Sequence, residues 1–209
     1  MRTFGLIPAA GKSVRMGQPK LLLPLGGTTV LGRVLAAVRA GGVADVLVVV
    51  GPQLPALAEA ARADGAHVLT LAEDTADMRA TCLHGLAWLE ARFAPQRDDG
   101  WLLLPADHPT CRAQVVQALL AAAGHPALRE RSIVVPVHAG RRGHPVWLRW
   151  EYVAAIRAMG EGEGLNRYVR ERAAQTLELD WPDAEVLRDL DTPEDYRRLV
   201  EEIAAHAAG

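Results

Sequence analysis

The chain has 209 residues and a mass of 22.5 kDa, with half of its residues apolar, 23% charged and a mean hydropathy of +0.05. This balance excludes an intrinsically disordered chain and predicts a single domain over residues 1–209. The formal net charge is −2, from 23 basic and 25 acidic residues. Proteins that bind nucleic acid usually carry a basic excess, so we expect no nucleic-acid partner.

Cysteine content and hydropathy narrow the class of protein further. The two cysteines, Cys82 and Cys111, are too few for a disulfide framework or a four-thiolate metal site. No segment approaches the roughly 20 apolar residues of a membrane span, and the first apolar run is too short for a signal peptide. We therefore expect a reduced, cytoplasmic, soluble protein with no membrane partner.

Short β-rich runs alternate with longer helical patterns up to about residue 137. The run VLVVV at 46–50 is β-branched throughout, which is typical of a strand buried on both faces of a parallel sheet. The alternation predicts right-handed crossovers and an α/β fold of three layers, with an open, doubly wound, mostly parallel sheet. The pattern predicts strands over 3–8, 46–50, 67–71, 101–105 and 132–137, and helices over 29–40, 56–64, 78–93 and 112–123.

The pattern is less regular after residue 137. The last helix should begin just after Thr192, because threonine is a good N-cap and Pro193 suits the first helical position. We expect this second half to supply a substrate wall for the same domain. The residue pattern of this half predicts strands over 145–148, 176–179 and 185–187, and helices over 152–159, 165–172 and 193–206.

The loop at 8–20 follows the first predicted strand and is rich in glycine, proline and cations. Ligands of open α/β sheets bind at the carboxyl ends of the strands, and a phosphate site needs approachable backbone amides with positive charges nearby. Lys12, Arg15 and Lys20 supply those charges. Lys12 and Lys20 are the only two lysines in the sequence. The loop therefore predicts an anion site, although a long surface loop with incidental charges remains the alternative.

Two familiar phosphate-binding motifs are absent from this loop. The pattern GxxxxGK[ST] requires a glycine five residues before Gly11, where Leu6 stands. The pattern GxGxxG fails because the next glycine after Gly11 is Gly17. The anion loop is therefore of another type.

Carboxylates gather at two further loops. Asp107 follows the strand predicted at 101–105 between two prolines, which suits a ligand of magnesium, although a helix cap is the alternative. His108 beside it is better explained as a packing or orienting residue. Asp189 and Asp191 would lie on one side of a strand at a period of two, which is weak evidence of a site when taken alone.

Four segments together resemble the MobA-like nucleotidyltransferases. AAGKSVRMGQPK at 9–20 resembles the signature loop of that family, and LLPADHP at 103–109 resembles its metal-binding segment. RGHP at 142–145 and DLDTPEDY at 189–196 match two further elements in the family's order. The chain looks most like the molybdenum cofactor cytidylyltransferases, because AAG at 9–11 is the form associated there with cytosine.

The resemblance implies a Rossmann-like nucleotidyltransferase fold with a nucleotide-binding half at 1–137 and an acceptor-side half at 138–209. Asp107 and Asp191 would hold Mg²⁺, or Mn²⁺ in its place, and Arg142 and His144 would bind the acceptor. Arg15, Lys20 and Asp107 would be the catalytic residues. The nucleotide would bind to Ala9, Ala10, Gly11, Lys12, Ser13, Arg15 and Lys20.

The reaction implied is transfer of CMP from CTP to a small phosphorylated acceptor, molybdopterin cofactor, with release of pyrophosphate. An acceptor phosphate is already ionised, so rate would come from positioning and charge neutralisation. The partners implied are the nucleoside triphosphate, the acceptor, and a molybdoenzyme or its chaperone.

One segment departs from the family pattern. Residues 77–82 read DMRATC where the family usually has a GMSxS-like sequence. This departure either changes the preference for base or acceptor, or makes Arg79 an added phosphate contact and nucleotide-binding residue. The GEGEG turn at 160–164 is either a lid or a solvated turn. Two other functions stay open: a transferase for a sugar-phosphate or alcohol-phosphate acceptor, and a nucleotide-binding redox or regulatory protein. Intact Lys20, Asp107 and Asp191 argue against the second.

Overall fold

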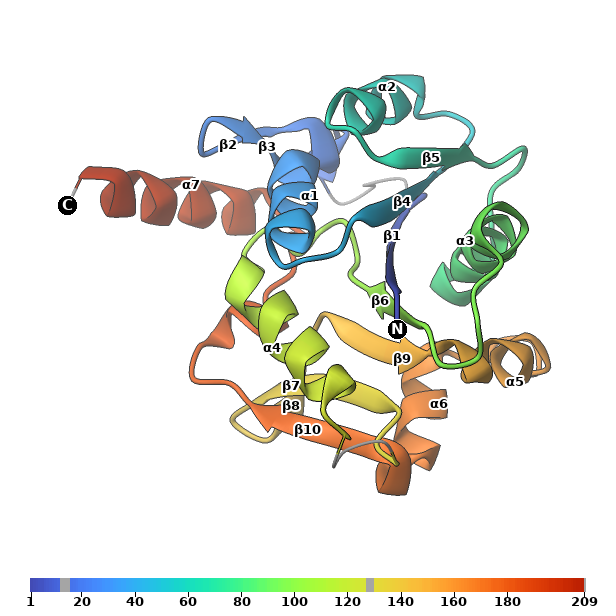
Figure 1. Cartoon of the computed structure of the whole chain (residues 1–209). Coiled ribbons are helices and arrows are strands. Elements are labelled where there is room, and N and C mark those ends of the chain that lie inside the picture. The colour runs from blue at the N-terminus through green and yellow to red at the C-terminus, as the bar shows by residue number, and fades with distance from the viewer. Residues whose placement is uncertain (12–15, 127–129, 209) are drawn as a thin grey trace.

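The computed structural model describes residues 1–11, 16–126 and 130–208. In this part of the chain the main sheet has eight strands, in the order β10-β7-β9-β6-β1-β4-β5, with β8 beside β7 (Figure 1). A separate two-stranded hairpin is formed by β2 (Pro24–Leu25) and β3 (Thr28–Thr29). None of the described helices is long and apolar enough to cross a membrane.

The first half of the chain forms a parallel sheet from β–α–β units, as predicted. Strand β1 lies in the middle and pairs in parallel with β4 on one side and β6 on the other. The strands of this half are β1 (Thr3–Ala9), β4 (Asp45–Val50), β5 (His67–Thr70) and β6 (Gly100–Leu103). Its helices are α1 (Val30–Ala40), α2 (Pro55–Ala63), α3 (Met78–Phe93) and α4 (Ala113–Gly124).

The second half extends the sheet past β6 and brings in one reversed strand. β9 (Val146–Arg149) runs antiparallel between β6 and β7 (Ile133–His138), so that these two strands keep the same direction. β8 (Arg141–Arg142) and β10 (Thr176–Asp180) pair with β7. The helices of this half are α5 (Val153–Arg157), α6 (Leu165–Glu171) and α7 (Pro193–Ala208).

Alternate side chains of the strands enter two apolar layers, one on each face of the sheet. Ile7 and Ala9 pack with α1, α2 and α4 on one face, whereas Phe4 and Leu6 pack with α3, α5 and α6 on the other. Figure 1 shows these two sets of helices on opposite sides of the strands. The sheet is therefore buried on both faces, and its loops at the carboxyl ends of the strands are left to form a site.

Two predicted elements have a different form in the structure. Residues 184–187 form a 3-10 helix, η6 (Ala184–Leu187), rather than the predicted strand. The helix predicted over 152–159 is a 3-10 turn, η4 (Trp150–Tyr152), followed by the short helix α5. In a short apolar run, periodicity alone cannot tell a strand from a single helical turn. This ambiguity accounts for the different forms of residues 184–187 and 150–157.

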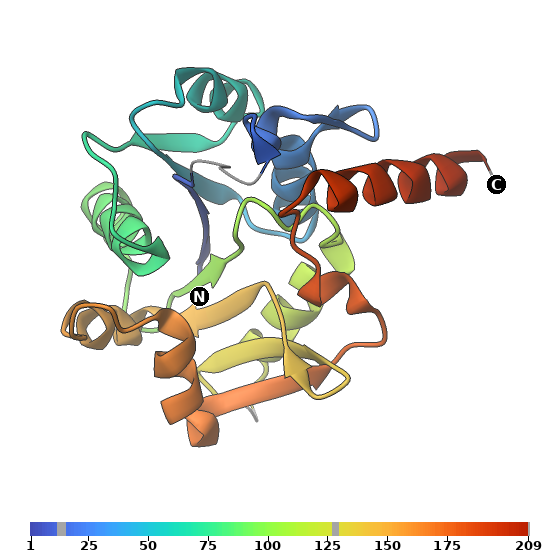
Figure 2. The ribbon, with the colours of Figure 1, turned by 180° about the vertical axis from the view of Figure 1, so that it is seen from behind.

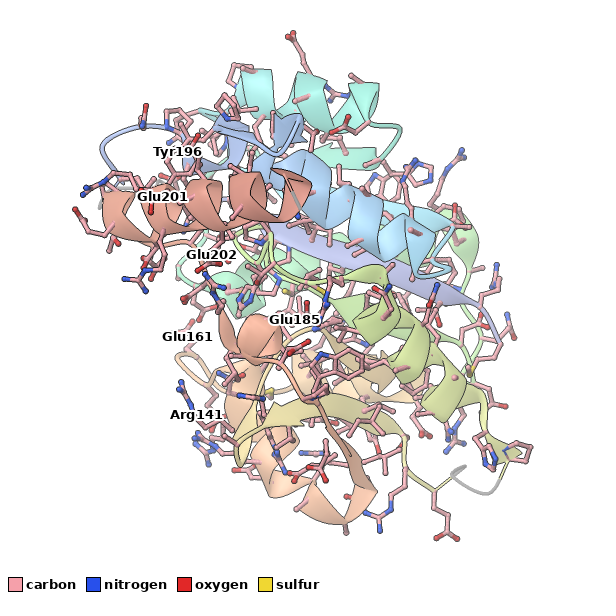
Figure 3. The ribbon with its side chains drawn as sticks, turned by 90° about the vertical axis from the view of Figure 1, so that its left-hand side faces the viewer. Arg141, Glu161, Glu185, Tyr196, Glu201 and Glu202 are labelled. Atoms are coloured by element: carbon pink, nitrogen blue, oxygen red, sulfur yellow. The ribbon has the colours of Figure 1, made fainter. Side chains whose placement is uncertain are left out.

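Helix α7 is fixed at its start and on two sides. The side chains and backbones of Thr192 and Asp195 bond reciprocally, a capping box that confirms the predicted helix start. Tyr196 donates its hydroxyl to the carbonyl oxygen of Pro24 (2.6 Å), and Glu202 pairs with Arg188 (2.8 Å). Figure 3 shows Tyr196 and Glu202 on different sides of this helix. The segment that leads into α7 is thereby held against the body of the protein.

Candidate active site

A pocket of about 460 Å³ opens at the carboxyl ends of β1 and β6. This volume lies within the range of about 300–1,000 Å³ that is usual for small-molecule sites, and the position is the one expected for an open α/β sheet. Its lining consists of Pro8, Ala9, Ala10, Gly11, Lys20, Leu21, Thr75, Asp77, Met78, Thr81, Pro105, Ala106, Asp107 and Asp191.

Asp107 is placed by the chain that leaves β6. The pairing of this segment with β1 continues past the strand, because Ala106 donates its backbone N–H to the carbonyl oxygen of Pro8 (3.3 Å). The carboxylate of Asp107 is 28% exposed and faces the pocket. Helix α4 begins only at Ala113, with Arg112 as its N-cap. The alternative that Asp107 caps this helix is therefore wrong.

Asp191 reaches the pocket from the other end of the chain. Leu190 before it is buried and donates its backbone N–H to the carbonyl oxygen of Asp107 (2.8 Å). Figure 2 shows from behind how the segment that leads into α7 meets the loop between β6 and α4. This backbone bond sets the spacing of the two aspartates, although 84 positions separate 107 from 191 in the sequence.

Asp189 and Asp191 do not share a face, in contrast to the period-two prediction. Residues 188–191 form no strand in the structure. The exposed Asp189 lines a smaller hollow beside Pro109 and Leu199, whereas Asp191 lines the main pocket. Of the two carboxylates, Asp191 is the one that belongs to the site.

Lys20 lies between the two aspartates. It is the first residue of η2 (Lys20–Leu22), and the buried Leu21 anchors this turn in the core. The ammonium Nζ lies 2.9 Å from Oδ2 of Asp107, 3.1 Å from Oδ1 of Asp191 and 2.7 Å from the carbonyl oxygen of Leu190. Burial alone lowers the pKa of Lys20, but the charges and hydrogen bonds of the two aspartates outweigh it and raise that pKa. Lys20 is therefore charged at neutral pH.

The oxygens around Lys20 fit a divalent cation. Mg²⁺ and Mn²⁺ prefer oxygen ligands, and Mg²⁺ is usually held by one or two carboxylates together with substrate phosphates. The Lys20 ammonium stands in for such a cation, since oxygens of Asp107, Leu190 and Asp191 all converge on it. The described residues contain no cluster of three or more metal-ligating side chains, so water or phosphate oxygens would complete the shell.

The start of α3, where the site prediction named only Arg79, forms a wall of the pocket. Asp77 caps α3 by accepting the N–H of Ala80 (2.7 Å), and the hydroxyls of Thr75 and Thr81 lie 2.5 Å apart. Thr75, Asp77, Met78 and Thr81 line the pocket. The rule that ligands bind at the carboxyl ends of strands would have indicated this loop, because it follows β5.

The predicted nucleotide loop lies partly within the described residues. Ala9, Ala10 and Gly11 line the pocket, and Ala9 is buried at the end of β1. The predictions for Lys12, Ser13 and Arg15 lie outside the residues that the structure describes.

Arg79 does not line the pocket, in contrast to its prediction as a phosphate contact. Its guanidinium is buried on the far side of α3 and donates to the carbonyl oxygens of Ile156 (3.4 Å), Met159 (3.1 Å) and Gly160 (2.9 Å). A cation suits this place, because the carbonyl oxygens at the end of a helix carry partial negative charge. Arg79 thus ties the first turn of α3 to the end of α5 and to the GEGEG turn.

Arg142 and His144, predicted to bind the acceptor, are also not among the residues that line the pocket. Arg142 donates Nε to Glu178 of β10 (2.7 Å), and the backbone N–H of His144 donates to the carbonyl oxygen of Val186 (2.8 Å). The ring of His144 packs edge-on against His108, with centroids 4.9 Å apart. These contacts connect the β8–β9 turn to the loop of Asp107, and His108 packs there as predicted.

Burial keeps both histidines neutral. It lowers the pKa of His144 to about 3, with a further lowering from His108, and it also lowers the pKa of His108. Neither ring adds positive charge to the neighbourhood of Asp107 at neutral pH.

Comparison with known proteins assigns the family. A model of the MobA-like NTP transferase domain matches residues 5–177. The chain is 33% identical over 211 residues to a molybdenum cofactor guanylyltransferase of Cereibacter sphaeroides, strain ATCC 17029 / ATH 2.4.9, and the match covers 95% of each chain.

Solved structures agree with the fold. Rv0371c of Mycobacterium tuberculosis H37Rv, solved in complex with manganese, is 29% identical with a TM-score of 0.74, over 96% of this chain and 99% of that one. A nucleotidyl transferase of Methanothermobacter has a TM-score of 0.80 at 20% identity, over 98% of this chain and 99% of that one, and supports the fold alone.

These findings confirm a Rossmann-like α/β fold with a mostly parallel sheet, and they support nucleotidyl transfer. The curated relatives are guanylyltransferases, so they do not support the predicted cytidylyl subtype. The chain belongs to the family of proteins with a MobA-like NTP transferase domain.

Proposed function

We propose that the chain transfers a nucleotidyl group from a nucleoside triphosphate, bound with a divalent cation, to the phosphate of a molybdenum cofactor acceptor. The observation that carries this proposal is the convergence of Lys20, Asp107 and Asp191 at one pocket. The acceptor is inferred from the curated relatives, which are molybdenum cofactor guanylyltransferases.

The residues of the pocket suit a reaction in which charge neutralisation supplies the rate. Asp107 and Asp191 would hold the cation against the α- and β-phosphates, and Lys20 would bind the phosphate oxygens beside it. The bound Mg²⁺ or Mn²⁺ would neutralise charge on the phosphoryl group in transfer. The acceptor phosphate is already ionised, so no side chain needs to remove a proton from it, and the neutral His108 and His144 fit that requirement.

Two nucleotides have support from separate observations. Similarity over nearly the whole chain to guanylyltransferases favours GTP. The Ala9-Ala10-Gly11 sequence, which lines the pocket, favours CTP through the family pattern associated with cytosine. The wall formed by Thr75, Asp77 and Thr81 offers both donors and acceptors to a base.

The test is a transfer assay with each of the four α-labelled ribonucleoside triphosphates, Mg²⁺ or Mn²⁺, and molybdopterin cofactor. We expect pyrophosphate release with one nucleotide, dependence on the acceptor, and loss of both in Asp191→Asn. Asp189→Asn is the matched control, since Asp189 is exposed outside the pocket. Turnover with a sugar phosphate or an alcohol phosphate but not with the cofactor would contradict the proposed acceptor. Absence of transfer to all acceptors would contradict the activity.

Cytoplasmic location, and a molybdoenzyme or its chaperone as protein partner, stay predictions of the sequence. The division into a nucleotide-binding half at 1–137 and an acceptor-side half at 138–209 is part of the proposal, with the pocket walls drawn mainly from the first half.

A further inference from the structure

Among the residues that the structure describes, three oxygens from two distant segments surround the Lys20 ammonium. Asp107 contributes Oδ2 at 2.9 Å from the loop after β6, while Leu190 and Asp191 contribute a carbonyl oxygen at 2.7 Å and Oδ1 at 3.1 Å from the segment before α7. The side chain of Lys20 is only 13% exposed, although both carboxylates are more than a quarter exposed to the pocket. Lys20 is therefore enclosed by the acidic side of the pocket.

This arrangement uses the full donor capacity of the ammonium. A lysine ammonium has three N–H bonds, and three oxygens lie within hydrogen-bond distance of Nζ. To bind a phosphate oxygen as well, Lys20 must give up at least one of these contacts. A triphosphate therefore has to compete with these oxygens for the ammonium.

The same two carboxylates are the ligands that a divalent cation would use. Lys20 and a cation held by Asp107 and Asp191 would lie within a few ångströms of each other, and like charges at that separation repel strongly in a partly buried site. The two cations therefore compete for the pair of carboxylates. A triphosphate removes this conflict, because its anionic oxygens can accept the ammonium and also complete the shell of the metal.

We infer that Lys20 is a resident counter-ion that competes with a free divalent cation for Asp107 and Asp191 and yields the site to the metal–triphosphate complex. The inference rests on the proposed function, since it takes a triphosphate as the ligand. It gives Lys20 a second role besides phosphate binding, which is to select the metal-bound nucleotide over the free metal. In thermodynamic terms, Lys20 increases the positive coupling between metal and nucleotide.

The test measures binding of Mn²⁺ alone, by the loss of the EPR signal of free Mn²⁺, to the full-length wild-type protein and to Lys20→Met. Methionine has a similar length but no charge and no donor. We expect Lys20→Met to bind Mn²⁺ about tenfold more tightly than the wild type, a change of about 1.4 kcal/mol. The matched control is Arg97→Met, which removes one positive charge paired with Glu151 just before β6, at the opposite end of the strand from Asp107. We expect wild-type affinity in this variant.

A second measurement keeps the inference testable if Lys20→Met folds less well. With no ammonium between them, two close carboxylates destabilise the variant, and binding of Mn²⁺ relieves that repulsion. We therefore expect Mn²⁺ alone to raise the melting temperature of Lys20→Met by more than that of the wild type. A non-hydrolysable triphosphate should enhance Mn²⁺ binding in the wild type and do so less in the variant.

The outcomes separate this inference from the proposed function. Equal or weaker Mn²⁺ binding by Lys20→Met, or no binding of Mn²⁺ by either protein, would overturn the counter-ion role. Tighter binding in the variant with no nucleotidyl transfer by the wild type would leave the role of Lys20 standing while the proposed activity fails. Tight binding that persists in Lys20→Met/Asp107→Asn would place Mn²⁺ on other residues and would also overturn the inference.

Discussion

The backbone N–H of Leu190 donates a hydrogen bond to the carbonyl oxygen of Asp107, at 2.8 Å. Because this bond joins backbone groups, it holds the loop after β6 and the segment before α7 in register without help from the aspartate side chains. Substitution of either carboxylate should therefore leave the local backbone in place. The acidic side of the pocket is a prebuilt frame on which Lys20 or a metal ion can be held.

Asp107→Asn and Asp191→Asn should each lower kcat by about 100-fold or more, because a metal ion supplies several kcal/mol of charge stabilisation to the transferring phosphate. Circular dichroism and melting temperature should change little, as the backbone frame is intact. Asp189→Asn, two residues away but exposed outside the pocket, should keep wild-type activity. Normal turnover in Asp191→Asn would show that the carboxylate has another role.

Gly143→Ala should disturb the site from a distance. A Cβ at Gly143 would lie 2.3 Å from the carbonyl oxygen of Val186, in the η6 segment that leads toward Asp191. Overpacking of this kind costs about 1–3 kcal/mol, and we expect that loss in the free energy of unfolding measured with urea, together with a fall in kcat. Gly164→Ala is the control, since a Cβ there would meet none of the described atoms within 4 Å. A Gly143→Ala variant with unchanged stability would mean that η6 can shift freely.

Arg79→Ser should destabilise the fold but leave nucleotide affinity nearly unchanged. The carbonyl oxygens of Met159 and Gly160 would lose their charged donor, at a cost of about 1–3 kcal/mol. Urea unfolding and nucleotide titration of the same variant check the two halves of this prediction. A stable variant with much weaker triphosphate binding would instead support the phosphate contact that the sequence pattern indicated. Arg157→Met, which removes a half-exposed pair with Glu90, is the surface control.

The stability of the protein should decline in mild acid because of His144. Burial and the neighbouring His108 lower its pKa in the folded state to about 3, whereas an unfolded histidine has a pKa of about 6.5. Between these values the unfolded chain takes up the proton first, so the free energy of unfolding decreases as the pH falls from about 6.5 toward 3. Chemical denaturation across this pH window should show a smaller decrease in His144→Gln. An identical pH dependence in the two proteins would contradict this assignment.

The fold could be predicted from the sequence where local chemistry decides the structure. The helix over 78–93 was predicted with the bounds of α3, and Thr192 caps α7 as its residue type suggests. β9 was predicted as a strand, but its reversed direction was not, because hydrophobic periodicity carries no information about which strand becomes a neighbour. Residues 185–187 were predicted as a strand but lie in a 3-10 helix, because the periodicity of so short an apolar run does not separate the two structures.

The site could be predicted as a set of loops but not as a set of contacts. Lys20, Asp107 and Asp191 were each predicted, yet nothing local indicates that Lys20 bonds to both aspartates or to the carbonyl oxygen of Leu190. The prediction of Arg79 as a phosphate contact was wrong for the same reason: the sequence does not show whether a residue in the first turn of a helix faces the pocket or points away from it. Those choices depend on tertiary packing, which joins residues far apart in the chain.

The most direct measurement is a crystal structure of the protein with Mn²⁺ and a non-hydrolysable triphosphate, in which anomalous scattering locates the metal. We expect one Mn²⁺ ion bound by carboxylate oxygens of both Asp107 and Asp191, at roughly the 2.1 Å typical of Mg²⁺, with Lys20 moved from both carboxylates onto a phosphate oxygen. A metal ion bound elsewhere, or a Lys20 ammonium still held between the two aspartates with the triphosphate in place, would contradict this expectation.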